Sequence, residues 1–217
     1  MSFDRLAKHY SALEWLLAGG RLQICRTAFL GEAIKARAIL LVGEGHGRFL
    51  EELCRASLDS AICYVDASAE MSRVARARIE ADNAGRARPV EFQAIPILQF
   101  QTKRAFDLIS TQFFLDCFAE EELRRIIAKL ANLLQAGGTW IVTDFQVPKS
   151  GWRRWRAQIV LTLAYGFFRM ATRLPAKRLI APQPLLKAEG LELEKRVEFN
   201  CGLLYAELWK KPQTLVS

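Results

Sequence analysis

An apolar stretch that runs straight into three alternating glycines is the most constraining feature of this chain. Residues 39–47 read Ile-Leu-Leu-Val-Gly-Glu-Gly-His-Gly, and a helical pattern follows over residues 47–57. A second apolar stretch then ends at Asp66. Glycine accepts left-handed backbone dihedrals and lets another group approach the main chain closely. The order strand, glycine turn, helix and strand therefore predicts a βαβ unit with a binding turn at its first junction.

The acidic residue that ends the second apolar stretch indicates what the turn would bind. Asp66 lies 23 residues after Gly43, close to the ~20 residues that precede a ribose-binding carboxylate in such units. A dinucleotide-binding turn carries G-x-G-x-x-G, and here Arg48 stands at the third glycine position. The pattern predicts a nucleoside site and disfavours one alternative, an NAD-dependent oxidoreductase.

Two further motifs follow in chain order. Residues 106–110 (FDLIS) read as a later strand, and residues 134–142 (LQAGGTWIV) read as a glycine turn into the next strand. With the first glycine turn and Asp66, they resemble the class I S-adenosylmethionine-dependent methyltransferases of small-molecule type, found in quinone biosynthesis and natural-product formation. The resemblance implies S-adenosylmethionine as cofactor and S-adenosylhomocysteine as product.

The alternation of strand and helix patterns predicts an α/β fold, a doubly wound, Rossmann-like sheet of seven mostly parallel strands. Strands are expected over 37–43, 61–66, 89–94, 105–112, 138–145, 191–199 and 202–210, with helices over 47–57, 68–83 and 119–135. The last two strands lack a crossover helix between them, which predicts an antiparallel C-terminal hairpin. We expect one domain, 1–217, made of a helical lid (1–30), a cofactor-binding core (31–146), a basic and aromatic lid (147–190) and C-terminal strands (191–212).

The resemblance also implies which residues meet the cofactor. They lie in the N-terminal lid, the glycine turn and the ends of the later strands: Tyr10, Gly43, Glu44, Gly45, His46, Gly47, Asp66, Ala67, Ser68, Met71, Ile95, Thr111, Gln112 and Phe113. Two positions depart from the family pattern, because Leu41 and Ile95 stand where carboxylates are usual. These departures leave open a non-catalytic or membrane-associated cofactor-binding protein.

Three side chains are candidates for the base that removes the acceptor's proton. His9 has an unperturbed pKa near neutrality, and Asp116 and Asp144 are expected at the carboxyl ends of strands, where open α/β sheets bind ligands. Phe145 follows Asp144 where a metal site would want another oxygen, so no metal is expected. The candidate acceptor-binding residues are aromatic, which favours an apolar or aromatic small molecule: Trp15, Phe114, Trp152, Tyr165 and Phe168.

Charge is concentrated in one segment. No acid occurs between Asp144 and Glu189, where nine lysines and arginines are interleaved with aromatic residues, and the rest of the chain carries 22 basic and 23 acidic residues. The uncharged run 157–168 is shorter than the ~20 residues that span a bilayer. Residues 149–178 therefore indicate either a lid over the acceptor pocket, the interpretation we favour, or a helix in peripheral contact with a membrane.

Other partners and compartments are disfavoured by composition. A basic segment can bind nucleic acid, but residues 110–116 (STQFFLD) lack the Asn/Asp-Pro-Pro-aromatic motif of base-methylating enzymes. Five cysteines without a C-x-x-C pair indicate a reducing compartment rather than disulfides or zinc. With no secretory segment apparent, we expect a cytoplasmic protein.

Overall fold

The structure is a computed structural model that describes residues 20–56, 59–81, 90–148, 150–152, 154–159 and 179–213. A central sheet of seven strands runs through it, in the order β3-β2-β1-β4-β5-β7-β6. Its strands are β1 (Ala38–Val42), β2 (Ala61–Val65), β3 (Val90–Gln93), β4 (Phe106–Gln112), β5 (Leu134–Phe145), β6 (Glu192–Phe199) and β7 (Leu204–Lys210).

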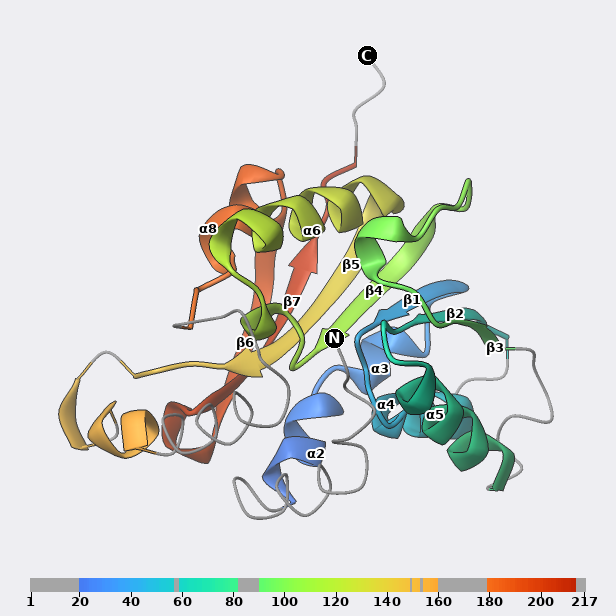
Figure 1. The fold of residues 1–217 in the computed structure, drawn as a ribbon. Helices are drawn as coiled ribbons and strands as arrows, with labels where there is room; N and C mark the ends of the chain where they lie inside the picture. The colour runs from blue at the N-terminus through green and yellow to red at the C-terminus, as the bar shows by residue number, and fades with distance from the viewer. Residues whose placement is uncertain are drawn as a thin grey trace.

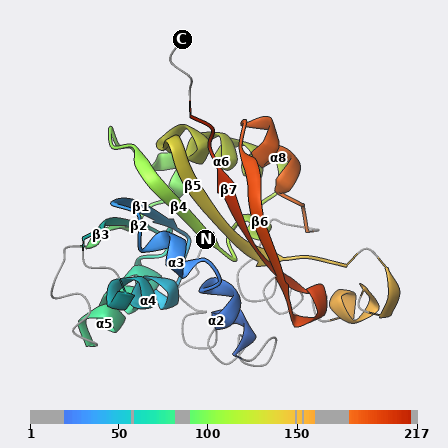
Figure 2. The same ribbon diagram turned by 180° about the vertical axis from the view of Figure 1, so that it is seen from behind.

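Helices cover both faces of the sheet (Figures 1 and 2). One face carries α2 (Arg21–Arg26), α3 (Leu30–Ala33), α4 (Arg48–Ala56) and α5 (Ala69–Ala81), and the other carries α6 (Glu120–Leu133) and α8 (Gln183–Ala188). Short 3-10 turns are η2 (Ile97–Gln99), η3 (Leu115–Cys117) and η4 (Asn200–Gly202). Two hydrophobic clusters fill the layers between sheet and helices. The predicted doubly wound architecture is confirmed.

The five strands β1 to β5 pair in parallel, and β7 pairs antiparallel with both β5 and β6. The central strands are buried on both sides, as parallel strands between two helical layers must be: the residues of β1 from Ile39 to Val42 are all buried. The expected antiparallel C-terminal hairpin is also confirmed.

One predicted boundary is wrong. The sequence placed a helix up to residue 135 and a strand from residue 138, but α6 ends at Leu133 and β5 begins at Leu134. The strand includes the glycine pair because the backbone N–H of Gly137, whose φ is +74°, donates to the Lys211 carbonyl at 2.9 Å. Lys211 in turn donates its backbone N–H to Gly138 at 3.0 Å. Pairing with the C-terminal segment thus replaces the isolated turn that the local pattern predicted.

Candidate active site

The glycine turn lies at the carboxyl end of β1, between the ends of β2 and β4. Its three glycines have φ angles of +64° (Gly43), +67° (Gly45) and +74° (Gly47), in the left-handed region that side chains disfavour. Gly43 donates its N–H to the carbonyl of Val65 at 2.9 Å. The hydroxyl of Tyr64 donates to the carbonyl of Gly45 at 2.5 Å. The turn is therefore held from β2 on both sides.

The surroundings of the three glycines differ, and only the middle one faces open space. A Cβ atom added at Gly43 would lie 1.9 Å from the Phe114 ring, and one at Gly47 would lie 2.7 Å from the Cβ of Ala75. A Cβ atom at Gly45 would meet nothing within 4 Å. The outer glycines thus permit close packing inside the protein, whereas Gly45 leaves its backbone accessible to a ligand.

Asp66 lies beside this open position. Its Oδ2 accepts from the N–H of Gly45 at 3.1 Å, and its Oδ1 accepts from the N–H of Ser68 at 2.8 Å. Burial raises the pKa of Asp66, while these two hydrogen bonds oppose the rise. The Ser68 hydroxyl accepts from the N–H of Met71 at 3.2 Å, at the start of α5. One carboxylate therefore joins the turns that follow β1 and β2, and it lies at the strand end where the sequence predicts a ribose-binding acid.

Glu44 faces inward rather than toward the open side of the turn. The side chain is buried, and its Oε1 accepts from the N–H of Phe49 at 2.7 Å, in the first turn of α4. Burial raises the pKa of Glu44 to about 7, and the positive charge of Arg26 acts in the opposite direction. The Glu44 carboxyl thus caps the first turn of α4 by accepting a backbone N–H, although burial disfavours its charged form. His46 is also buried, and its carbonyl accepts from Arg78 at 2.9 Å.

The end of β4 provides the next wall of the site. Thr111 accepts from the indole N–H of Trp140 at 3.1 Å, so its side chain faces the α6 layer. Gln112 donates to the Ser110 hydroxyl at 2.9 Å, and its own Oε1 is buried without a hydrogen-bond partner in the described part of the chain. Phe113 follows with a φ of +54°. A buried acceptor without a donor is costly, so Gln112 is positioned to accept from a bound molecule.

Two aspartates form a buried pair after β4 and β5. Asp144 accepts from the N–H of Asp116 at 3.1 Å through Oδ2, and from the N–H of Phe145 at 2.9 Å through Oδ1. Burial, and then the adjacent Asp116 carboxyl, hold the pKa of Asp144 well above its usual range. The Cys117 thiol donates to Asp116 Oδ1 at 3.4 Å. Within the described residues, no group of three acidic, histidine or cysteine side chains is placed to hold a metal ion.

Aromatic rings line the same edge of the sheet. Phe113 and Phe145 lie with ring centroids 5.0 Å apart, and Phe114 and Phe118 meet edge to face at 4.8 Å. The guanidinium of Arg26 lies 5.0 Å from the centroid of Phe113. Phe114, which the sequence analysis names as a candidate acceptor-binding residue, therefore lies next to the glycine turn and against a second aromatic ring.

The remaining predicted site residues make none of the contacts given above or lie outside the described residues. Ile95 is partly buried against the α6-side cluster, and Trp152 is 64% exposed. Ala67 is exposed beside Asp66. The residues His9, Tyr10, Trp15, Tyr165 and Phe168 lie outside the described part of the chain.

Comparison with known proteins assigns this arrangement to a family. The family described as "Methyltransferase domain" matches residues 40–140, the span from β1 into β5 that contains the glycine turn, Asp66 and the end of β4. The chain belongs to the class I S-adenosylmethionine-dependent methyltransferases. It is thus a methyltransferase whose cofactor is S-adenosylmethionine, and the NAD-dependent alternative is set aside.

Individual relatives are similar over most of the chain. The demethylmenaquinone methyltransferase of Leptospira interrogans is 28% identical over 183 residues, which cover 77% of this chain and 72% of the relative. The structure of magnesium protoporphyrin IX methyltransferase from Synechocystis with bound S-adenosylhomocysteine superposes with a TM-score of 0.70 at 14% identity, covering 96% of both chains. The N-methyltransferase NodS of Bradyrhizobium japonicum, also with S-adenosylhomocysteine, gives 0.59 at 20% identity, covering 94% of this chain and 98% of that one.

The site fits a methyltransferase cofactor on its own geometry. The open side of Gly45, the carboxylate of Asp66 and the unpaired Oε1 of Gln112 all lie at the carboxyl edge of the sheet. Three of its contacts were missed by sequence reasoning: the Tyr64 hydroxyl on Gly45, the Glu44 cap and Arg26 on Phe113. The sequence offered one signal for such contacts: a polar group within an apolar stretch, such as the hydroxyl of Tyr64 in β2, needs a hydrogen-bond partner when it is buried.

Proposed function

We propose that this methyltransferase acts on a small acceptor that is apolar or aromatic. The observation that carries the proposal is the position of Phe114, whose ring packs on Gly43 of the cofactor turn and against Phe118. An aromatic surface this close to the glycine turn suits a flat or apolar molecule, because rings pack favourably on one another. The relatives named above have demethylmenaquinone and magnesium protoporphyrin IX in their names, which supports a small acceptor.

The residues that would hold the cofactor follow from their positions. Asp66 would accept from the ribose hydroxyls, and the main chain at Gly45 would lie against the nucleoside. Ile95 offers the adenine an apolar contact instead of a carboxylate. Gln112 would accept from the amino group at the methionine end. S-adenosylmethionine supplies an activated methyl carbon, which the acceptor attacks in line with the sulfur.

We further propose Asp116 as the base, with Asp144 as the residue that positions it. Asp116 is the more accessible of the two, and it lies after β4 beside the aromatic group. Asp144 fixes the backbone of Asp116 by accepting its N–H at 3.1 Å. Burial, and then the adjacent Asp116 carboxyl, raise the pKa of Asp144, so the pair resists carrying two negative charges at once. His9 is a second candidate and lies outside the described residues.

The experiment combines binding and turnover. Calorimetry should detect S-adenosylmethionine and not NAD, and a panel of phenols, quinols and amines should release S-adenosylhomocysteine for at least one apolar member. Release only with hydrophilic or macromolecular acceptors would contradict the acceptor class.

A matched pair of variants tests the base. Asp116→Asn should lower kcat by about 10²–10⁴-fold, the usual contribution of a positioned base, while its neighbour Cys117→Ser should keep most of it. The loss should shrink as pH rises, because hydroxide ionises a phenolic acceptor in solution. A kcat unchanged in Asp116→Asn would refute the role of Asp116.

A further inference from the structure

A short helix after β5 carries an exposed apolar face. Residues 151–152 and 154–159 are helical. The helix is attached on one side: Ala157 is buried in the α2-side cluster, and Arg156 donates to the side chain of Asn200 at 2.9 Å and to its carbonyl at 3.3 Å. The segment is therefore fixed to the body of the protein, while its opposite side is exposed in the part of the chain that the structure describes.

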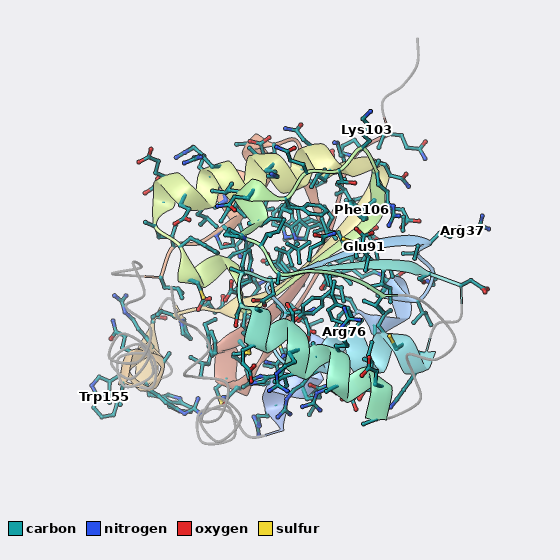
Figure 3. The ribbon with its side chains drawn as sticks, turned by 45° about the vertical axis from the view of Figure 1, so that its right-hand side comes forward. Arg37, Arg76, Glu91, Lys103, Phe106 and Trp155 are labelled. Atoms are coloured by element: carbon teal, nitrogen blue, oxygen red, sulfur yellow. The ribbon has the colours of Figure 1, made fainter. Side chains whose placement is uncertain are left out.

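The uncovered side is strongly apolar. Trp152 is 64% exposed, Trp155 is 70% exposed and Ile159 is 40% exposed. Their spacing of three and four residues puts them on one helix face, opposite Ala157. Figure 3 shows Trp155 projecting outward from the edge of the molecule. Single exposed apolar side chains are ordinary, but two tryptophans and an isoleucine on one short helix face indicate a surface that another body covers.

The charge of the sequence that contains this face favours one kind of partner. The face lies within the segment between Asp144 and Glu189, which has nine basic residues and no acid. Arg154 and Arg156 are on the same helix as the tryptophans. Tryptophan at the headgroup level, an aliphatic residue below it and basic residues around it are what an interfacial helix presents to anionic lipid. An aliphatic side chain such as Ile159 gives nucleic acid nothing to stack on.

The helix lies at the same edge of the sheet as the active site. Phe145 at the end of β5 pairs with Leu204, and Leu204 pairs with Phe199 at the end of β6. Asn200, which holds Arg156, follows directly. The exposed face therefore belongs to the carboxyl edge, where the glycine turn opens. Within the described residues, no helix is long and apolar enough to cross a bilayer.

We propose that the face formed by Trp152, Trp155 and Ile159 binds the surface of an anionic lipid bilayer. The sequence alone favoured a pocket lid for residues 149–178; the exposure of both tryptophans favours the membrane. The contact is peripheral: the side chains of the face enter the headgroup region, and the exposed basic residues of the segment are attracted to lipid phosphates. Binding of the bilayer does not depend on which acceptor is methylated, so a test of membrane binding can fail or succeed separately from a test of the proposed function.

Vesicle flotation tests the proposal. The full chain should float with vesicles of equal parts phosphatidylcholine and phosphatidylglycerol, should not float with phosphatidylcholine alone, and should be released by high salt, which screens exposed charges. Tryptophan fluorescence should shift to the blue when the anionic vesicles are added. Absence of flotation with the anionic vesicles would overturn the proposal.

Matched variants locate the contact. The double substitution Trp152→Ser and Trp155→Ser should reduce partitioning by at least about tenfold, whereas Leu193→Ser, which removes an apolar side chain 40% exposed on β6, should not. Arg154→Gln should reduce partitioning by about fivefold, since a basic residue at an anionic surface contributes ~1 kcal/mol. Lys103→Gln, at the far end of the molecule in Figure 3, should have no effect.

Three results would assign the face to something else and overturn the proposal. The first is flotation that survives the double tryptophan substitution. The second is tighter binding of a single-stranded oligonucleotide that displaces the vesicles. The third is a dimer in sedimentation that the double substitution dissociates. Thermal unfolding should be unchanged in all four variants, because the replaced side chains are exposed.

Discussion

The glycine turn offers a prediction in which stability and cofactor affinity should separate. Gly45→Ala and Gly47→Ala introduce the same methyl group into the same turn, and both residues have a positive φ. The added Cβ atom meets open space at Gly45, but at Gly47 it would lie 2.7 Å from the Cβ and 2.9 Å from the Cα of Ala75 in α5. The two variants therefore share the backbone strain and differ in packing.

The magnitudes follow from these two effects. Left-handed strain on a residue with a side chain costs about 1–2 kcal/mol, so Gly45→Ala should lower the free energy of unfolding by that amount. For a chain of this size this corresponds to a fall in Tm of about 2–8 °C. Overpacking adds about 1–3 kcal/mol, so Gly47→Ala should lose about 2–5 kcal/mol. Its fall in Tm should be about 4–20 °C.

Cofactor affinity should show the opposite order. The methyl group at Gly45 enters the side where the nucleoside would lie against the backbone, so Gly45→Ala should lose more affinity than Gly47→Ala, and Gly45→Val should not bind at all. Thermal unfolding and calorimetric titration with S-adenosylmethionine, on the same preparations, measure both quantities. If Gly47→Ala were the more stable variant, or if Gly45→Val bound the cofactor normally, the assignment of the open side would be wrong.

Two further substitutions test the carboxylates at the turn. Asp66→Ala should weaken S-adenosylmethionine binding by about 1.5–3 kcal/mol, the range for hydrogen bonds to a charged group, whereas Asp59→Ala, an exposed acid before β2, should leave calorimetric affinity unchanged. Glu44→Gln should flatten the pH dependence of stability. Burial raises the pKa of Glu44 from 4.5 to about 7. The contribution of this protonation to the free energy of unfolding is therefore fully present below pH 4.5 and is lost as pH rises through 7. The loss is about 3 kcal/mol, and denaturant unfolding at pH 5 and pH 8 should show it in the unmutated protein and not in the variant.

Local patterns were sufficient for the strands and for the position of the glycine turn. Hydrophobic periodicity and composition depend on only a few neighbouring residues, so the sequence predicted the ends of β1, β2 and β4 to within a residue or two. The glycines and Asp66 were found because a turn with positive φ and a strand-end carboxylate leave a signature along the chain. These features depend little on what packs around them.

Contacts between distant residues were less accessible. Glu44 follows a glycine at the mouth of the turn and so suggested a cofactor contact, yet its carboxyl points inward to Phe49. Thr111 was also expected to contact the cofactor, but its hydroxyl accepts a hydrogen bond from the Trp140 indole on the α6 side of the sheet. In both cases a buried N–H donor determines where the side chain points. Which donor lies within reach depends on how the whole fold packs, and the spacing of residues along the sequence does not reveal it.

The position of β7 has a consequence for how the protein is synthesised. Among the strands that the structure describes, β6 pairs only with β7, and β7 must first lie along β5 to bring β6 into the sheet. As the chain leaves the ribosome, β6 emerges before β7, the strand that connects it to the sheet, and β5 presents an open edge at the same time. Open edges invite pairing between chains. Substitutions that slow the docking of β7 should therefore reduce the yield of native protein in cells more than they reduce the stability of protein already folded.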